Sequence, residues 1–354
     1  MPKIIELAPG RWIGESQPCF IIAEVGQNHQ GDLEIAKRLI KAAKVRGWTY
    51  LMTNCVKFQK SCLHEKFNNA ALQRPYIGPN SWGGTYGEHK KYLEFSELQF
   101  KELQDYASQI NILFSASAMD IVSVDVLDSL GVPFIKIGSG DVNNFPMLQY
   151  AATKSKPLIV STGMQDMSTV ETVYHTLKAC NANFCLLHCV SAYPTPPQEV
   201  NLNVISKYKQ EFSDIPIGYS GHELGITISV AAVAMGVLER HITLDKTWKG
   251  SDHVCSLTPS EFQELVHQVR TVETALGNPI KCFQPSEKAC YDKLGKTLVA
   301  ARDMLAGKCL QEKDIKVKVA EPKGCPAEKY QQVIGRTLVR NVRQDESIMC
   351  SDFV

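Results

Sequence analysis

One short pattern recurs eight times along the chain: an apolar segment of roughly five residues followed by a stretch with helical spacing. This order places successive strands parallel and side by side. Eight units within about 275 residues have the size and rhythm of a (β/α)8 barrel, the TIM barrel. A doubly wound open sheet is the alternative, but no Gly-x-Gly-x-x-Gly follows the first strand. The predicted strands are Cys19–Ala23, Cys55–Gln59, Leu113–Ser117, Pro133–Ile137, Leu158–Ser161, Phe184–His188, Ile215–Tyr219 and Val237–His241.

Helix starts are predicted from capping boxes, in which a Ser or Thr precedes a Glu or Gln by three residues. Ser96, Ser168 and Thr258 stand at such positions, the last with Pro at the first helical position. The small-residue stretch Leu224–Met235 is expected to form the helix between the last two strands. The Gly-, Pro- and aromatic-rich stretch Phe67–Tyr92 has no clear period and predicts a long loop that is either functional or partly disordered.

The strand–helix pattern of the sequence ends near Gly277. Short alternation, clearest in Ile315–Val319, then predicts strands, with turns between them. We therefore expect a small, mostly-β domain near the lower size limit for independent folding. The expected divisions are a barrel domain at 1–283, a linker at 284–293 and the small domain at 294–354.

Composition excludes several classes of partner. The chain is 44% hydrophobic and 21% charged, with a formal net charge of +1, so neither a nucleic acid nor a membrane surface is expected as partner. The longest apolar run, Ile226–Leu238, is too short to span a bilayer. The first residues carry charges and no apolar core, so we expect no secretory signal. Twelve cysteines without a Cys-x-x-Cys pair indicate a reducing, cytoplasmic location.

Polar residues gather at the carboxyl ends of the predicted strands, where barrel enzymes build their sites. Two neighbouring strands end near a histidine, and strands lie about 4.8 Å apart, so both imidazoles could reach one metal ion. The alternative is two unrelated histidines, one bonded to a carbonyl and one facing solvent. The matching positions of His222 and His241 favour the metal site.

Lys57 and Lys136 lie inside apolar strands, beside hydroxyl residues and the turn Gly138–Gly140. Two ammonium groups with hydroxyl and backbone donors predict an anion pocket for a phosphate and a carboxylate. A Schiff-base lysine is the rival mechanism. Glu24 is a candidate acid or base, or serves only to neutralise Lys57.

Strand alternation places Glu239 on the same face as His241, so its carboxylate is expected at the barrel mouth. Asp252 follows in a Gly-containing loop and reaches the substrate only if that loop folds inward.

Multi-residue motifs occur in order along the chain: Ala23–His29, Val56–Gln59, Lys136–Asp141, Ser161–Met164, Tyr193–Pro194, Gly218–His222 and Glu239–His241. Together they resemble the sialic acid synthase family over nearly the whole chain. The segment Arg74–Lys90 is similar to the animal branch of that family, and the tail resembles its antifreeze-like (SAF) domain.

The resemblance implies condensation of phosphoenolpyruvate with N-acetylmannosamine or its 6-phosphate, giving sialic acid or N-acetylneuraminate 9-phosphate, with Mn²⁺ or Mg²⁺ as cofactor. It implies a metal site at His222 and His241 and catalytic roles for Glu24, Lys57 and Lys136. In this scheme the lysines neutralise charge and are not nucleophiles. The substrate-binding residues that it implies are Gln59, Ser117, Ser139, Asp141, Ser161, Ser191, Tyr193, Ser220, Glu239 and Asp252.

The resemblance also implies a homodimer in which the small domains are exchanged. Two places depart from the family pattern: extra residues at Trp48–Asn54, and a link at Gly236–Val237 that is two residues short. Because side chains alternate, losing two residues should leave His241 facing the barrel. The alternatives are an inactive sugar- or phosphate-binding protein on the same fold, or a synthase for a related nonulosonic acid.

Overall fold

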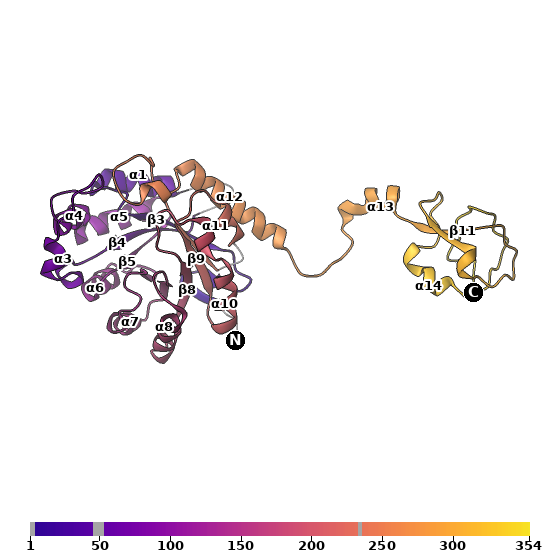
Figure 1. The fold of residues 1–354 in the computed structure, drawn as a ribbon, viewed down its shortest axis with the longest axis horizontal. Coiled ribbons are helices and arrows are strands. Elements are labelled where there is room, and N and C mark those ends of the chain that lie inside the picture. Colours follow the sequence, from indigo (N-terminus) through magenta and orange to yellow (C-terminus); the bar gives the residue numbers. More distant parts are fainter. Residues whose placement is uncertain (1–3, 45–52, 233–235) are drawn as a thin grey trace. The chain divides into compact units, whose positions relative to one another are not determined.

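The computed structural model describes residues 4–44, 53–232 and 236–354 (Figure 1). Most of the extra stretch at 48–54, and the end of the helix expected before the eighth strand, lie outside these residues. The chain divides into two compact units, Met1–Gly277 and Asn278–Val354. No described helix is long and apolar enough to cross a membrane.

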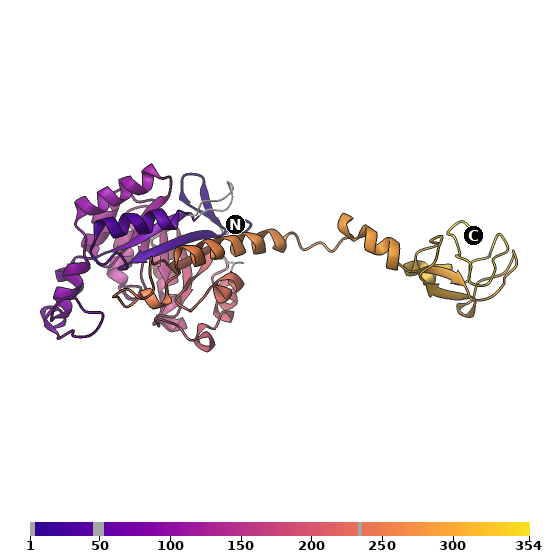
Figure 2. The same cartoon turned by 90° about the horizontal axis from the view of Figure 1, so that it is seen from above.

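Eight parallel strands of the first unit close into a barrel, which confirms the predicted fold and excludes the open sheet. Helices surround the strands (Figures 1 and 2). The strands follow one another around the barrel in chain order, and the last pairs with the first. They are β3 (Phe20–Gly26), β4 (Cys55–Lys60), β5 (Leu113–Ala118), β6 (Ile135–Ile137), β7 (Leu158–Ser161), β8 (Phe184–Cys189), β9 (Ile217–Gly221) and β10 (Val237–His241).

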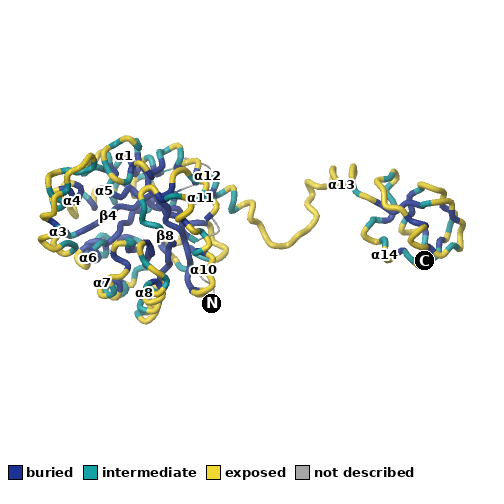
Figure 3. The backbone as a smooth tube through the Cα atoms, in the orientation of Figure 1, coloured by how far each residue is buried: buried dark blue, intermediate teal, exposed yellow. Residues whose placement is uncertain are grey.

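Alternation along the strands sorts their side chains into two cores. Phe20 and Ile22 of β3 belong to an inner cluster inside the barrel, whereas Ile21 packs in the outer cluster between strands and helices. Figure 3 shows the strands buried along their length, with exposed residues on the surrounding helices. Glu24 is the next inward-facing residue of β3, and His241 of β10 is its register partner on the neighbouring strand. The short link before β10 has therefore left His241 in the expected phase.

An antiparallel hairpin precedes the barrel and was not predicted from the sequence. It consists of β1 (Ile4–Ala8) and β2 (Arg11–Gly14). Leu7 and Ile13 of this hairpin are fully buried in the inner cluster, together with Phe20 and Val237 at the start of their strands. The hairpin therefore closes the amino-terminal end of the barrel and leaves the opposite end for a site.

The helices begin mostly at side-chain caps. The capping boxes predicted at Ser96 and Thr258 are confirmed. The helices of the first unit are α1 (Leu33–Ala43), α2 (Leu63–Lys66), α3 (Asn69–Gln73), α4 (Tyr86–Leu93), α5 (Glu97–Gln109), α6 (Ile121–Ser129), α7 (Phe145–Ala152), α8 (Met167–Ala179), α9 (Pro197–Val200), α10 (Asn203–Glu211), α11 (Thr227–Ala231), the 3₁₀ turn η1 (His253–Cys255) and α12 (Pro259–Leu276).

The prediction of a loop without periodic structure at 67–92 was wrong, because α3 and most of α4 lie there. Both helices are short and rely on caps: Asn68 accepts a hydrogen bond at the start of α3, and Thr85 forms a capping box with Glu88 at α4. Aromatic contacts such as Tyr76 with Tyr86, at 5.3 Å between ring centroids, hold the segment together. Helices of this length show too few turns for a periodic signal.

Three smaller predictions also need correction. The capping box at Ser168 is absent, because Asp166 caps α8 instead and accepts from the backbone N–H of Thr169. The strand expected at 215–219 begins two residues later, after Pro216, which lacks a backbone donor. The strand expected at 133–137 is ordered as a strand only from Ile135.

The second unit has its own buried core, which includes Leu298, Leu310, Cys325, Val333 and Ile348. The alternation predicted strands here, and two of them, both contributing residues to this core, pair antiparallel with each other. The elements of the unit are η2 (Pro285–Glu287), α13 (Lys288–Leu294), β11 (Thr297–Ala300), η3 (Glu312–Asp314), β12 (Ile315–Lys318), η4 (Ala327–Lys329) and α14 (Tyr330–Val333).

Candidate active site at the carboxyl ends of the barrel strands

A polar cavity of about 270 Å³ opens at the carboxyl ends of the barrel strands. The structure brings together there every site residue predicted from the sequence except Asp252. Four further side chains, Lys66, Met119, Met164 and Cys189, also line it. The predicted residues in the lining are Glu24, Lys57, Gln59, Ser117, Lys136, Ser139, Asp141, Ser161, Ser191, Tyr193, Ser220, His222, Glu239 and His241.

Lys57 is the centre of a buried hydrogen-bonded group. Its Nζ lies 2.6 Å from Glu24 Oε2 and donates to Ser117 Oγ at 2.9 Å. Gln59, two residues along β4, donates to Glu24 Oε1 at 3.0 Å. Lys57 is 1% exposed, so its charge is held by these partners rather than by water.

Lys136 forms a second group on the other side of Glu239. Its Nζ donates to Ser161 Oγ at 2.6 Å and lies 3.8 Å from Glu239 Oε1. Glu239 Oε1 is also 3.5 Å from Lys57 Nζ, so this carboxylate lies between both ammonium groups. Glu239 Oε2 is buried without a hydrogen-bond partner. The cavity thus presents two cations, two hydroxyls and one carboxylate oxygen available for another ligand.

Burial and neighbouring charge set the protonation of these carboxylates in opposite directions. Burial raises the pKa of Glu24 to about 7, although Lys57 works against this. Burial also opposes ionisation of Glu239, but the two lysines outweigh it and lower the pKa of that carboxyl. Burial lowers the pKa of Lys136. Glu239 is therefore a fixed anion, whereas Glu24 can gain or lose a proton near neutral pH.

Serine hydroxyls from the loops after β6 and β8 complete the wall. Ser139 Oγ accepts the backbone N–H of Gly163 at 3.0 Å. A Cβ at Gly163 would lie 2.3 Å from Ser191 Oγ and 2.8 Å from Ser139 Oγ, so only glycine permits this approach. Ser191 Oγ is buried and has no hydrogen-bond partner. The hydroxyls of Ser139 and Ser191 can therefore donate hydrogen bonds to an anion in the cavity.

The two strand-end histidines lie side by side at the mouth, with ring centroids 5.4 Å apart and the ring planes tilted by 51°. His222 Nδ1 lies 2.9 Å from the carbonyl oxygen of Val190; a carbonyl only accepts, so the lone pair of this ring is on Nε2. His241 Nδ1 is buried and has no hydrogen-bond partner. The carbonyl of Val190 therefore fixes the lone pair of His222 on Nε2, and the Nδ1 of His241 is buried without a partner.

These two nitrogens fit a divalent metal ion, since neutral imidazole is a common metal ligand and a buried ring nitrogen without a partner is costly. Burial lowers the pKa of His241 to about 3, which keeps the ring neutral. No group of three or more protein ligands occurs in the described residues. Water or substrate oxygens would therefore fill the other positions.

Tyr193 packs against both histidines, with ring centroids 4.1 Å from His222 and 6.1 Å from His241. Cys189 Sγ lies 4.0 Å from His222 Nδ1. Alternation along β8 from Cys185 and Leu187 predicts that Cys189 faces the cavity. No motif around Cys189 indicated a role for its thiol, so the sequence did not identify it as a site residue. Met119 and Met164 follow strand ends and carried no signal in the sequence.

Asp252 is not brought into this cavity. It lines a small neighbouring pocket with Gln27, Trp82 and His89, and its Oδ1 accepts from Ser251 Oγ at 2.7 Å. The loop after β10 therefore places Asp252 beside the segment between β4 and α5 rather than over the lysines.

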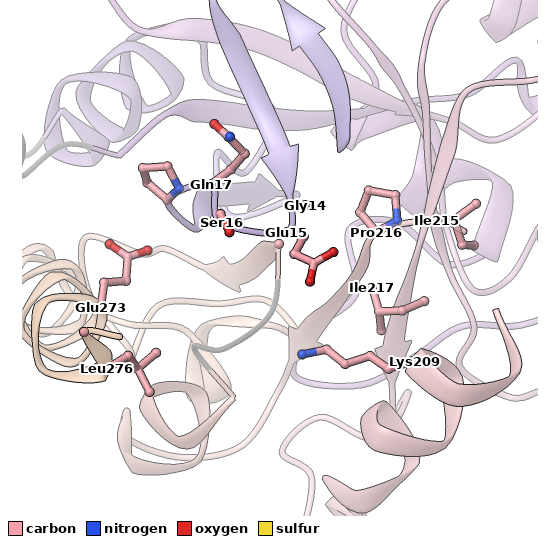
Figure 4. A pocket seen from close by; sticks show the side chains of 13 residues that line it. Gly14, Glu15, Ser16, Gln17, Lys209, Ile215, Pro216, Ile217, Glu273 and Leu276 are labelled. Atoms are coloured by element: carbon pink, nitrogen blue, oxygen red, sulfur yellow. The ribbon is translucent and has the colours of Figure 1, made fainter. Parts of the chain in front are cut away.

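A larger cavity of about 590 Å³ lies at the opposite, amino-terminal side of the barrel (Figure 4). Its lining includes Glu15, Lys209 and Glu273, with Leu276 at its edge. Figure 4 shows these side chains spread around the opening. Gly236 also lines it.

Two family models match the chain. A model of the NeuB family matches residues 39–281, and a model of the SAF domain matches residues 295–354. Human N-acetylneuraminate-9-phosphate synthase is 56% identical over 99% of this chain and 96% of its own length. The Drosophila melanogaster protein of the same name is 46% identical over 95% of this chain and 96% of its own.

Among solved structures, the N-acetylneuraminic acid (sialic acid) synthetase of Leptospira borgpetersenii, in complex with citrate, is similar at 32% identity and a TM-score of 0.69. The match covers 83% of this chain and 96% of that one.

Proposed function

Since the chain belongs to the NeuB family, we propose that it condenses phosphoenolpyruvate with N-acetylmannosamine 6-phosphate. The products are N-acetylneuraminate 9-phosphate and inorganic phosphate, so the chain is a carbon–carbon bond-forming synthase. One observation carries the proposal beyond the resemblance: a single cavity holds two buried lysine–serine pairs on either side of Glu239, beneath the histidine pair.

The lysines bind the anionic groups of phosphoenolpyruvate. Lys57 and Lys136 are both buried, and each already holds a serine hydroxyl that can also donate to a phosphate or carboxylate oxygen. With Glu239 ionised and Glu24 protonated, the site has a net positive charge toward the incoming anion. A bound anion in turn raises the pKa of Glu24 further.

In the reaction, C3 of the enol forms a bond with the aldehyde carbon of the open-chain sugar. Water then adds to C2, and the C2–O bond to phosphate breaks. Glu24, whose pKa burial raises to about 7, can give its proton to the aldehyde oxygen as the C–C bond forms and then accept one from the water that adds to C2. Glu239 lies near both lysines, where its negative charge would stabilise the positive charge that develops at C2.

His222 and His241 would hold Mn²⁺ or Mg²⁺ in this scheme. A metal ion held there would supply Lewis-acid polarisation of the sugar aldehyde. The protein would fix the imidazoles through Val190 and through packing against Tyr193.

We also propose that the protein works in the cytoplasm as a homodimer with exchanged small domains. Support comes from the 12 free cysteines, several of them buried, and from the SAF unit that follows the barrel.

The test is a product assay with phosphoenolpyruvate and either N-acetylmannosamine or its 6-phosphate, reading phosphate release and product mass. We expect the 9-phosphate product, its loss in excess chelator and its return with Mn²⁺ or Mg²⁺. His222→Ala should abolish the metal response, whereas the exposed control His175→Asn should not.

Phosphoenolpyruvate left unconsumed with both sugars would point to a binding protein instead. Full activity in chelator would contradict the metal site. A borohydride-trapped adduct on Lys57 or Lys136 would favour the Schiff-base mechanism.

A further inference from the structure

The segment between β4 and α5 gathers three cationic side chains around one pair of aromatic rings. The guanidinium of Arg74 lies 4.0 Å from the centroid of Tyr86, and Lys90 Nζ lies 5.4 Å from the same ring. Lys66 Nζ is 5.6 Å from the ring of Phe67, which packs edge-on against Tyr86 at 5.5 Å. Two rings therefore hold Lys66, Arg74 and Lys90 in one place.

These three charges have few acidic partners. Lys66 Nζ lies 3.7 Å from Asp141 Oδ2. In the part of the chain that the structure describes, neither Arg74 nor Lys90 forms an ion pair, and Lys90 donates only to the neutral amide of Gln27, at 2.8 Å. Like charges held together without compensation attract an anion.

The acids nearby do not cancel this charge. Glu94, at the end of α4, is occupied by Lys60 and by the hydroxyl of Ser61. The negative charge of Asp252 raises the pKa of Lys90. Burial, together with the charges of Lys66 and Arg74, outweighs this and lowers the pKa to about 8. An ammonium that is hard to keep charged gains most when an anion binds beside it.

The cluster begins at the rim of the active-site cavity. Lys66 itself lines that cavity. Lys90 contacts Gln27, which follows Gly26 at the end of β3, and a Cβ at Gly26 would lie 3.1 Å from the His241 ring. Gly26 therefore lies close to the His241 ring, and the next residue, Gln27, contacts Lys90 of the cationic cluster.

We propose that Lys66, Arg74 and Lys90 bind the terminal phosphate of the sugar substrate and so select the phosphorylated sugar over the free one. The inference rests on the proposed function: with the aldehyde carbon at the lysines and histidines, C6 lies at the far end of the sugar, toward the rim. Arg74 supplies a planar pair of donors, and the two lysines supply point charges.

Direct binding tests this independently of turnover. Calorimetry would compare N-acetylmannosamine 6-phosphate with N-acetylmannosamine, with the full chain saturated by Mn²⁺. We expect the sugar phosphate to bind at least tenfold more tightly. Arg74→Gln and Lys90→Gln should each lower that ratio about threefold, because each removes a charge-assisted hydrogen bond, and the double variant should abolish it. Lys91→Gln, an exposed neighbour on α4, is the matched control.

Thermal melting would show that the variants fold. A ratio unchanged in the double variant, or lowered equally by Lys91→Gln, would overturn the phosphate site. If the chain binds the sugar phosphate through these residues but forms no product, the phosphate site stands and only the synthase proposal fails.

Discussion

At the scale of single residues, burial gives several ionisable side chains protonation states that their residue types would not have in water. Glu24 and Glu239 face the same lysine, yet only Glu24 has a raised pKa, because two lysines face Glu239. Both interpretations of Glu24 drawn from the sequence are compatible with this: it forms an ion pair with Lys57 and still titrates near neutrality. The ion pair does not remove it from acid–base chemistry.

His29 shows the same effect away from the lysines. Its ring is 3% exposed and stacks on Phe95 at 4.2 Å between centroids, while its Nδ1 accepts the backbone N–H of Gly31 at 3.0 Å. Burial lowers the pKa of His29 to about 3, whereas an unfolded histidine titrates near 6.5. Between these values the unfolded chain binds a proton that the folded chain does not.

This difference predicts a pH-dependent stability. The contribution of His29 is complete above about pH 6.5 and falls as the pH drops toward 3, by about 2 kcal/mol at pH 5. In His29→Asn, the free energy of unfolding should be lower at pH 7.5 but should fall less steeply between pH 7.5 and pH 5. Denaturant unfolding at both pH values measures this.

His175→Asn, which changes an exposed histidine, is the control and should keep the slope of the parent protein. Equal slopes in the parent and in His29→Asn would show that the ring is accessible to protons in the folded state.

At the scale of elements, the hairpin β1–β2 is the part of the first unit that the strand–helix pattern did not contain. Its two strands are short, and only Leu7, Ala8 and Ile13 among their residues are buried. Ile13 fills the amino-terminal end of the barrel, whereas its neighbour Trp12 points the other way and is 43% exposed.

The hairpin should therefore contribute to stability without touching the chemistry. Ile13→Ala should lower the free energy of unfolding by about 2–4 kcal/mol, because it leaves a cavity inside a closed barrel. Trp12→Ala, one residue away on the opposite face, should cost much less. Urea unfolding of both variants tests this, and similar losses in the two would mean that the hairpin does not seal the barrel.

The sequence predicted the strand ends well because a period of two fixes which side chain faces inward. Once Lys57 and Glu239 were assigned to strands, their direction followed. Short capped helices such as α3 and α4 could not be predicted in this way, since tertiary aromatic contacts stabilise them. The cationic cluster on that segment was missed for the same reason, because Lys66, Arg74 and Lys90 converge only when the segment folds.

At the scale of the whole molecule, the two units have separate cores. All residues of the inner and outer barrel clusters precede Gly277, and the buried cluster of the second unit lies between Leu298 and Ile348. A chain that ends at Gly277 should therefore unfold cooperatively on its own. Under the proposed exchange, the small unit would serve the barrel of the partner chain.

Exchange can be tested by complementation between two defective chains. One carries Lys136→Ala, which removes a buried charge from the barrel cavity but leaves the small unit intact. The other ends at Gly277, which keeps the barrel cavity but removes the small unit. If each small unit completes the active site of the partner chain, a mixed dimer contains one intact barrel whose site is completed by the intact small unit of the other chain. Each chain alone should then show little activity, while mixing equal amounts after mild dissociation should restore up to about half of the parental rate per intact barrel. Light scattering measures the dimer, and phosphate release measures the recovery. Full sugar affinity in the truncated chain alone, or no gain on mixing chains that do form dimers, would show that each barrel works without its partner's small unit.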